Sequence, residues 1–322
     1  MLRLQVVRRR LLRSIEPGAL GDSLFHWLTG VVAVGVVALL GLIAVVLLIA
    51  AQQSIRTFGV GFLTGTRWDS VADIYGAAPF VYGTLVTAAF ALLLGVPISL
   101  GVAIFLSELA PAKLRVPLTY VVELLAAVPS VVYGFWGLKV LAPVMASSIE
   151  PAVQGLLGFL PLFQGTPTGS DKFSASVILA VMIIPTISAV SREALRAVPQ
   201  SQREAALALG ATRWESTRVA VVRYARAGIF GAIILGLGRA VGETMAVTMM
   251  IGNKNSISVS LFDQGQTIAS LIANSFGEAQ IGYIQSSALM ELGLVLMLMS
   301  LVINVFARLM VSRVLRRGEG LG

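Results

Sequence analysis

The chain has 322 residues, of which 57% are hydrophobic and only 12% are charged. An average soluble domain is about 25% charged, so this composition excludes an ordinary soluble enzyme, a disordered chain and a fibrous protein. The absence of cysteine and the single histidine, His26, argue against a thiolate site, a histidine metal site and a Ser-His-Asp triad. No Gly-Lys-Ser/Thr sequence occurs, so a P-loop is missing. We therefore expect no catalytic residues, no metal site, no cofactor and no ATP hydrolysis by the chain itself.

Six apolar segments are long enough to cross a bilayer, which takes about 20 residues. They cover residues 27–51, 77–107, 116–138, 173–191, 227–252 and 281–307. The first has a longer apolar run than a signal peptide, so we interpret it as a retained anchor. A seventh uncharged stretch, 151–170, contains three prolines and four glycines, which interrupt helices, and we predict an external loop or a partly inserted segment there. The predicted fold class is an all-α polytopic membrane protein with six transmembrane helices.

The basic residues divide unevenly between the two sides of this arrangement. Eighteen of the 24 lysines and arginines lie before the first segment, in the second-to-third and fourth-to-fifth links, and after the last segment, whereas five lie in the opposite links. The positive-inside rule then places both termini in the cytoplasm, as an even number of spans also requires. The net charge of +8 thus follows from membrane topology, and we expect no nucleic-acid partner.

Three consecutive predicted spans contain an internal proline: Pro97, Pro129 and Pro185. Proline removes a backbone hydrogen bond and kinks a helix, and in a membrane this is tolerated where neighbours or water replace the lost bond. Proline is also generally commoner in membrane helices. Three in succession favour kinked helices that move or line a cavity.

The predicted fifth span carries two charged residues, Arg239 and Glu243. Residues four apart share one face of a continuous helix, and the pair can offset the cost of a charge in the bilayer, about 2.5–3.5 kcal/mol. We predict that Arg239, Glu243 and the adjacent Thr244 line a translocation path, with a structural ion pair as the alternative. Small residues repeat every fourth position on this span and predict close helix packing on both sides; the rows are Ala232, Gly236 and Ala240, and Gly238, Gly242 and Ala246.

The fourth-to-fifth link, residues 191–226, has strong helix signals. Ser201 with Glu204, and Thr212 with Glu215, have the spacing of capping boxes. Gly210 between them is a typical helix terminator. The pattern predicts two short helices joined at Gly210, with an exposed knob that fits a groove of a partner protein.

Glu204, Ala205, Ala206 and Gly210 in this link resemble the EAA motif of permease subunits of binding-protein-dependent ABC importers. Other stretches are similar to the PstC family of phosphate importer permeases over most of residues 58–310; they include residues 73–76, 82–87, 124–137, 236–247 and 288–293. The resemblance implies a type I ABC importer permease fold, with a coupling helix between spans four and five that docks on an ATPase. It also implies that phosphate passes Arg239 and Glu243. Arg223 stands where the family motif has a proline, which puts the usual bend before span five in question.

The same resemblance implies the partners: a PstA-like second permease subunit, PstB-like ATPase subunits, an external PstS-like phosphate-binding protein and inorganic phosphate, in a bacterial plasma membrane. The predicted organisation is a cytoplasmic basic N-terminus, a first helix with its external loop, a permease core of five helices and a cytoplasmic tail. These parts cover residues 1–26, 27–76, 77–311 and 312–322. Two alternative functions remain: a permease subunit for molybdate or sulfate, and an ion-coupled secondary transporter that needs no ATPase.

Overall fold

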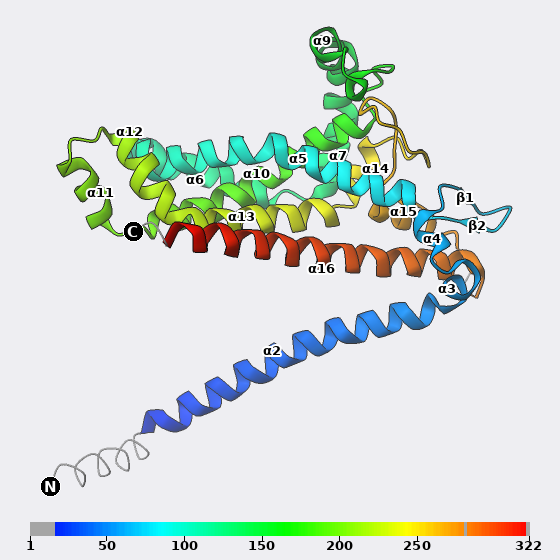
Figure 1. The fold of residues 1–322 in the computed structure, drawn as a ribbon, viewed down its shortest axis with the longest axis horizontal. Coiled ribbons are helices and arrows are strands. Elements are labelled where there is room, and N and C mark those ends of the chain that lie inside the picture. Colours follow the sequence, from blue (N-terminus) through cyan, green and yellow to red (C-terminus); the bar gives the residue numbers. More distant parts are fainter. Residues whose placement is uncertain (1–16, 280–281, 320–322) are drawn as a thin grey trace. The chain divides into compact units, whose positions relative to one another are not determined.

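The computed structural model describes residues 17–279 and 282–319 and divides the chain into two units, Met1–Ala50 and Ala51–Gly322. The first unit contains α2 (Pro17–Ala50), whose residues 21–50 form a candidate membrane span (Figure 1). The uncharged, mostly apolar stretch from Trp27 onwards accounts for most of the length of this helix. The predicted basic N-terminus falls largely on residues 1–16, which lie outside the described residues.

Within the described residues, six helices are long and apolar enough to cross a membrane, which confirms the predicted number. Their bounds are Gly21–Ala50, Ala78–Leu109, Ser130–Leu157, Lys172–Arg196, Arg213–Gly242 and Ile284–Leu309. Four of them overlap the predicted segments closely. The fifth shares only residues 227–242 with the predicted 227–252, because the helix ends at Gly242. The third differs most.

The predicted third span, 116–138, is wrong because the helix breaks inside it. α6 (Ala112–Ala127) ends before Pro129, and Val128 is extended, with φ −66° and ψ 128°. A residue that precedes proline is disfavoured in the helical region, so Val128 interrupts the helix. Pro129 therefore caps the next helix at its N-terminus and is not a kink inside a span.

The crossing helix instead runs from Ser130 to Leu157, through α7 (Ser130–Trp136), α8 (Ala142–Val144) and α9 (Glu150–Leu157), with π-helical turns between them. The predicted loop at 151–170 is consequently wrong for its first seven residues. Pro151 is the second residue of α9, which follows the π-helical turn Met145–Ile149 without a break, so this proline does not end the helix. After Gly158 the chain does form irregular structure with one short 3-10 turn.

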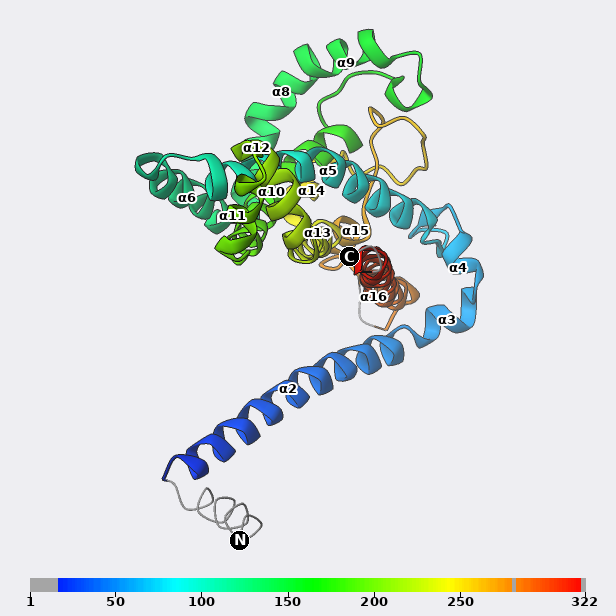
Figure 2. The same ribbon diagram turned by 60° about the vertical axis from the view of Figure 1, so that its left-hand side comes forward.

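The core of the second unit is built around α10 (Lys172–Arg196). The most apolar stretch of α10 is 67% buried, against 28% or less in the other spans of this unit. Figures 1 and 2 show α5 (Ala78–Ile104) and α13 (Arg223–Gly242) running beside α10, with α16 (Ile284–Glu319) next to α13.

Small residues permit this close packing. A Cβ placed on Gly236 of α13 would lie 2.5 Å from the Ile187 side chain of α10, and one on Gly95 of α5 would lie 3.0 Å from Ile183. The inner small-residue row of span five, Ala232, Gly236 and Ala240, is buried, as predicted.

The remaining elements connect the spans at the end opposite the fourth-to-fifth link. They are α3 (Gln52–Phe58), α4 (Gly61–Thr64), β1 (Trp68–Asp69), β2 (Ile74–Tyr75), α14 (Met245–Met250) and α15 (Ile268–Ser275). The two strands form a small antiparallel hairpin, which the sequence did not predict. Its turn is closed by Asp69, whose Oδ1 accepts hydrogen bonds from the backbone N–H groups of Val71 and Ala72.

Candidate functional site

Arg239 lies on the last turn of α13 and reaches towards the middle of α10. Its Nη1 donates a hydrogen bond of 3.1 Å to Oγ1 of Thr186, which is the fifteenth of the 25 residues of α10. Tyr133 of α7 lies within the electrostatic range of the same guanidinium. The half-buried Arg239 therefore links the end of α13 to the middle of α10.

Glu243 does not share a helix face with Arg239, contrary to the prediction from their spacing. α13 ends at Gly242, and Glu243 is extended, with φ −69° and ψ 128°. Its Oε1 accepts a 3.4 Å hydrogen bond from the backbone N–H of Ala246, in the first turn of α14. None of the ion pairs within the described residues involves Arg239. The two charges therefore do not neutralise each other directly.

The break between α13 and α14 is partly closed by threonine side chains. Thr244 donates from Oγ1 to the carbonyl of Gly242 at 3.3 Å, and Thr248 donates to the carbonyl of Thr244 at 2.7 Å. Irregular backbone in a membrane is tolerated only inside protein or beside a water-filled cavity. Gly238 and Gly242 are exposed, and a Cβ placed on either meets no atom within 4 Å. This face of the break is thus open to a solute or to another subunit.

Two of the three prolines lie inside spans as predicted, Pro97 in α5 and Pro185 in α10. Pro185 directly precedes Thr186, so the partner of Arg239 stands next to a missing backbone hydrogen bond. Pro129 lies in the α6–α7 break instead.

The EAA-like residues lie on α11 (Gln200–Ala208), and their spacing to Gly210 has a structural reason. The N–H of Ala211 donates to the carbonyl of Ala206 at 3.2 Å, and the N–H of Gly210 donates to that of Leu207 at 2.9 Å. This pair of bonds is a Schellman motif, which requires a left-handed residue, and Gly210 has φ +88°. Gly210, four residues after Ala206, therefore ends α11 in a fixed turn.

The second predicted capping box is confirmed, and the first is wrong. Thr212 and Glu215 bind each other reciprocally at the start of α12 (Arg213–Ser216). α11, however, begins at Gln200 with Pro199 as its N-cap, so Ser201 does not cap it. α12 is also not a separate short helix, because it continues through a π-helical turn (Thr217–Val222) into α13. Arg223, in the place of the family proline, is helical and follows that turn directly.

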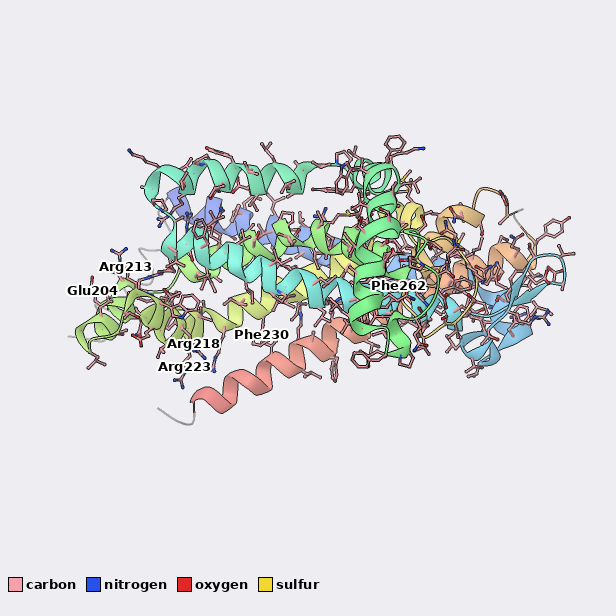
Figure 3. All side chains as sticks on the ribbon, turned by 90° about the horizontal axis from the view of Figure 1, so that it is seen from above. Glu204, Arg213, Arg218, Arg223, Phe230 and Phe262 are labelled. Carbon is pink, nitrogen blue, oxygen red and sulfur yellow. The ribbon has the colours of Figure 1, made fainter. Side chains whose placement is uncertain are left out.

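The turn around Gly210 is exposed. Glu204, Ala205 and Gly210 are exposed, Leu209 is 91% exposed, and no residue of α11 is buried. Figure 3 shows Glu204 at one end of the second unit and Phe262 towards the other. Arg213, Arg218 and Arg223 lie at the same end as Glu204. This end presents apolar and basic side chains together.

A buried carboxyl pair at the start of α10 was not predicted. Glu150 and Asp171 are both fully buried, and Ser174 joins them: its Oγ donates to Glu150 at 2.9 Å, and its backbone N–H donates to Asp171 at 2.9 Å. Burial and the nearby Glu150 raise the pKa of Asp171 from 3.8 to about 7. The one feature of the sequence that could have indicated this site is Asp171 before an apolar run, since aspartate is a favoured N-cap residue.

The comparisons with known proteins agree with this architecture. Residues 95–317 match the family model of the "binding-protein-dependent transport system inner membrane component". The chain is 42% identical over 315 residues to the phosphate transport system permease protein PstC of Mesorhizobium japonicum, covering 97% of this chain and 96% of that protein. It is 46% identical over 296 residues to the protein of the same name from Haemophilus influenzae, covering 91% and 93%.

Among solved structures, a chain of a bacterial ABC transporter involved in the import of the acidic polysaccharide alginate has a similar fold. The TM-score is 0.59 at 17% identity, over 94% of this chain and 99% of that chain. At this identity the likeness concerns the fold alone.

Proposed function

Because the chain belongs to the family of binding-protein-dependent transport system inner membrane components, we propose that it is the membrane-spanning permease subunit of an ATP-driven importer of inorganic phosphate. Family membership makes it a multi-pass transport subunit with a type I ABC importer permease fold, whose ATP hydrolysis belongs to a partner ATPase. The observation that carries the substrate assignment is the identity above 40%, over nine-tenths of both chains, to proteins named for phosphate transport.

The proposed solute path passes Arg239. Thr186 gives the guanidinium a neutral acceptor and no negative charge, so the positive charge stays available to an anion. An arginine fork suits phosphate because its planar donors match two phosphate oxygens. Glu243 stands four residues further on, at the break, where its charge opposes prolonged anion binding. Arg239 thus attracts phosphate, Glu243 keeps the residence short, and Thr244 lines the irregular backbone between them.

The proposed second half of the path is a PstA-like subunit that covers the open face at Gly238 and Gly242. Residues without side chains let two helices approach closely in a membrane. The buried Ala246 is not part of this face, since it lies beyond the helix break. A heterodimer of two permease subunits would then enclose Arg239.

The proposed docking site for PstB-like ATPases is the exposed turn formed by Glu204, Ala205, Ala206 and Gly210. The excess of basic residues in the 191–226 link supports a cytoplasmic location for this turn and for both termini. An external PstS-like protein would then deliver phosphate at the opposite end. The domain organisation given above, with its permease core at 77–311, belongs to the same proposal.

The test is reconstitution of the chain with its second permease subunit, ATPase subunits and external binding protein in proteoliposomes. Radiolabelled phosphate should accumulate only when ATP and the binding protein are both present, and unlabelled sulfate or molybdate should not compete. Accumulation of molybdate or sulfate in place of phosphate would contradict the substrate assignment. Accumulation by this chain alone, driven by an ion gradient, would contradict the ABC mechanism.

A further inference from the structure

Arg203, directly before Glu204 of the EAA-like motif, points into the protein instead of outwards. Its Nη2 lies 2.8 Å from Oε1 of Glu108, and its Nε lies 3.2 Å from Oε2. The two side chains are only 17% and 12% exposed. Glu108 belongs to the π-helical turn (Phe105–Leu109) that ends the α5 span. A two-pronged, shielded ion pair therefore ties α11 to α5.

The same guanidinium also binds the end of α10. It donates to the carbonyl of Leu195 at 2.9 Å and to the carbonyl of Val198. The last carbonyls of a helix have no partner within it, and a cation there is favoured by the helix dipole. Arg203 therefore satisfies the C-terminal end of α10 while it holds Glu108.

The backbone of Arg203 makes the third connection, to span five. Its carbonyl accepts a 3.4 Å hydrogen bond from Oγ of Ser216, on the α12 segment that continues into α13. A buried apolar cluster contains residues of these same three helices; its members are Ala103, Leu195, Val198, Val221, Ala225 and Ile229. The ends of α5, α10 and α13 thus meet at one residue of the coupling loop.

We propose that Arg203, through Glu108, is the positioning residue that transmits movement of α11 to the membrane-spanning helices. The inference rests on the proposed function, because it needs an ATPase that moves α11. No residue of α11 is buried, so the Arg203 side chain supplies the ion pair to α5 and the bonds to the end of α10, while the bond from Ser216 to the backbone is independent of this side chain. If the Arg203 side chain were missing, a movement of the docked ATPase would rotate α11 about Pro199 without moving α5 and α10.

This assignment divides the motif region into two faces. Consecutive helical residues point about 100° apart, so Glu204 faces outwards towards a partner while Arg203 faces the core. Coupling between two sites requires a physical element whose arrangement both sites bias. α11, clamped by Arg203, is that element.

The test uses the complete complex in proteoliposomes, with ATP hydrolysis and phosphate uptake measured on the same vesicles. Arg203→Ala and Glu108→Gln should leave ATP hydrolysis within about twofold of wild type and lower phosphate uptake per ATP by roughly tenfold, a typical size for coupling between sites. Arg203→Lys keeps the charge but loses the fork, so it should give an intermediate ratio. The double variant Glu108→Gln/Arg203→Lys should be no worse than the worse single variant, because the two residues act as one unit.

The matched control is Arg196→Ala, which removes an exposed 3.7 Å pair with Glu193 at the end of the same α10. Exposed pairs contribute little, so its uptake per ATP should equal that of wild type. An unchanged ratio in Glu108→Gln and Arg203→Lys would overturn the inference. So would a loss of uptake that only tracks loss of subunits from the purified complex, even if Arg203→Ala itself fails to assemble. If the wild-type complex imports no phosphate, the proposed function fails instead.

Discussion

The buried carboxyl of Asp171 should make the folding stability of the chain fall as the pH rises. Its pKa is about 7 in the folded chain, because burial and Glu150 disfavour the charged form, against an ordinary value of 3.8. Between these two values the folded chain binds a proton that the unfolded chain has released. The contribution is therefore fully present below pH 3.8 and is lost as the pH rises through about 7.

The size of this effect follows from the shift. Each pKa unit corresponds to about 1.4 kcal/mol, so a shift of about three units amounts to about 4 kcal/mol of unfolding free energy between the two limits. Asp171→Asn removes the ionisation but keeps the cap, because an asparagine oxygen still accepts the bond from the N–H of Ser174. We expect the variant to be more stable than wild type at about pH 8 and to depend less on pH.

The measurement is thermal unfolding in detergent from about pH 5 to about pH 8, followed by the fluorescence of the four tryptophans. Asp69→Asn is the matched control, since the backbone N–H groups of Ala72 and Val71 lower the pKa of this aspartate. It should show no stabilisation at high pH. Parallel pH curves for wild type and Asp171→Asn would refute the reasoning.

Three further substitutions test the path, the turn and the packing. Arg239→Ala should reduce phosphate uptake at least tenfold while the purified complex stays intact, because the loss of one charge-assisted bond costs about 1.5–3 kcal/mol. Normal uptake by this variant would show that Arg239 does not line the path. Gly210→Ala should cost about 1 kcal/mol, because its φ of +88° is left-handed, and should weaken ATPase binding in a pull-down with purified subunits. Gly83→Ala would place its Cβ 2.1 Å from the carbonyl oxygen of Gln266. This overpacking should cost about 3 kcal/mol and lower the unfolding temperature strongly. Gly101→Ala on the same helix is the control, because its Cβ meets no atom within 4 Å and should leave the unfolding temperature unchanged.

The number of spans could be predicted because it depends on local composition alone. The third span was predicted wrongly because of its prolines, which are also local features of the sequence. Val128 precedes Pro129 and leaves the helical region for that reason, whereas Pro151 lies just after a π-helical turn and does not end its helix. An apolar window thus predicts that a helix crosses, but prolines decide which residues it contains.

The geometry of the candidate site differs from the one that the sequence predicted. The predicted pairing of Arg239 and Glu243 assumes an unbroken helix, but the helix breaks after Gly242 and the Glu243 carboxylate accepts a bond from the first turn of α14. The contact between Arg203 and Glu108 joins residues 95 positions apart. Such a pair leaves no periodic pattern in one sequence, because only the tertiary fold brings α5 and α11 together.

The incomplete hydrogen bonding of Arg239 is consistent with the proposal that this chain forms half of a translocation path. A guanidinium carries five N–H donors, and the described residues supply one hydrogen-bond acceptor, the hydroxyl of Thr186. An arginine in the bilayer is costly unless its donors are satisfied, so the remaining donors call for acceptors from water, a passing anion or a second subunit. A closed ion pair with Glu243 would have met that need within the chain and left no charge for a solute. The broken helix prevents this pairing, so the described residues leave the donors of Arg239 incompletely satisfied.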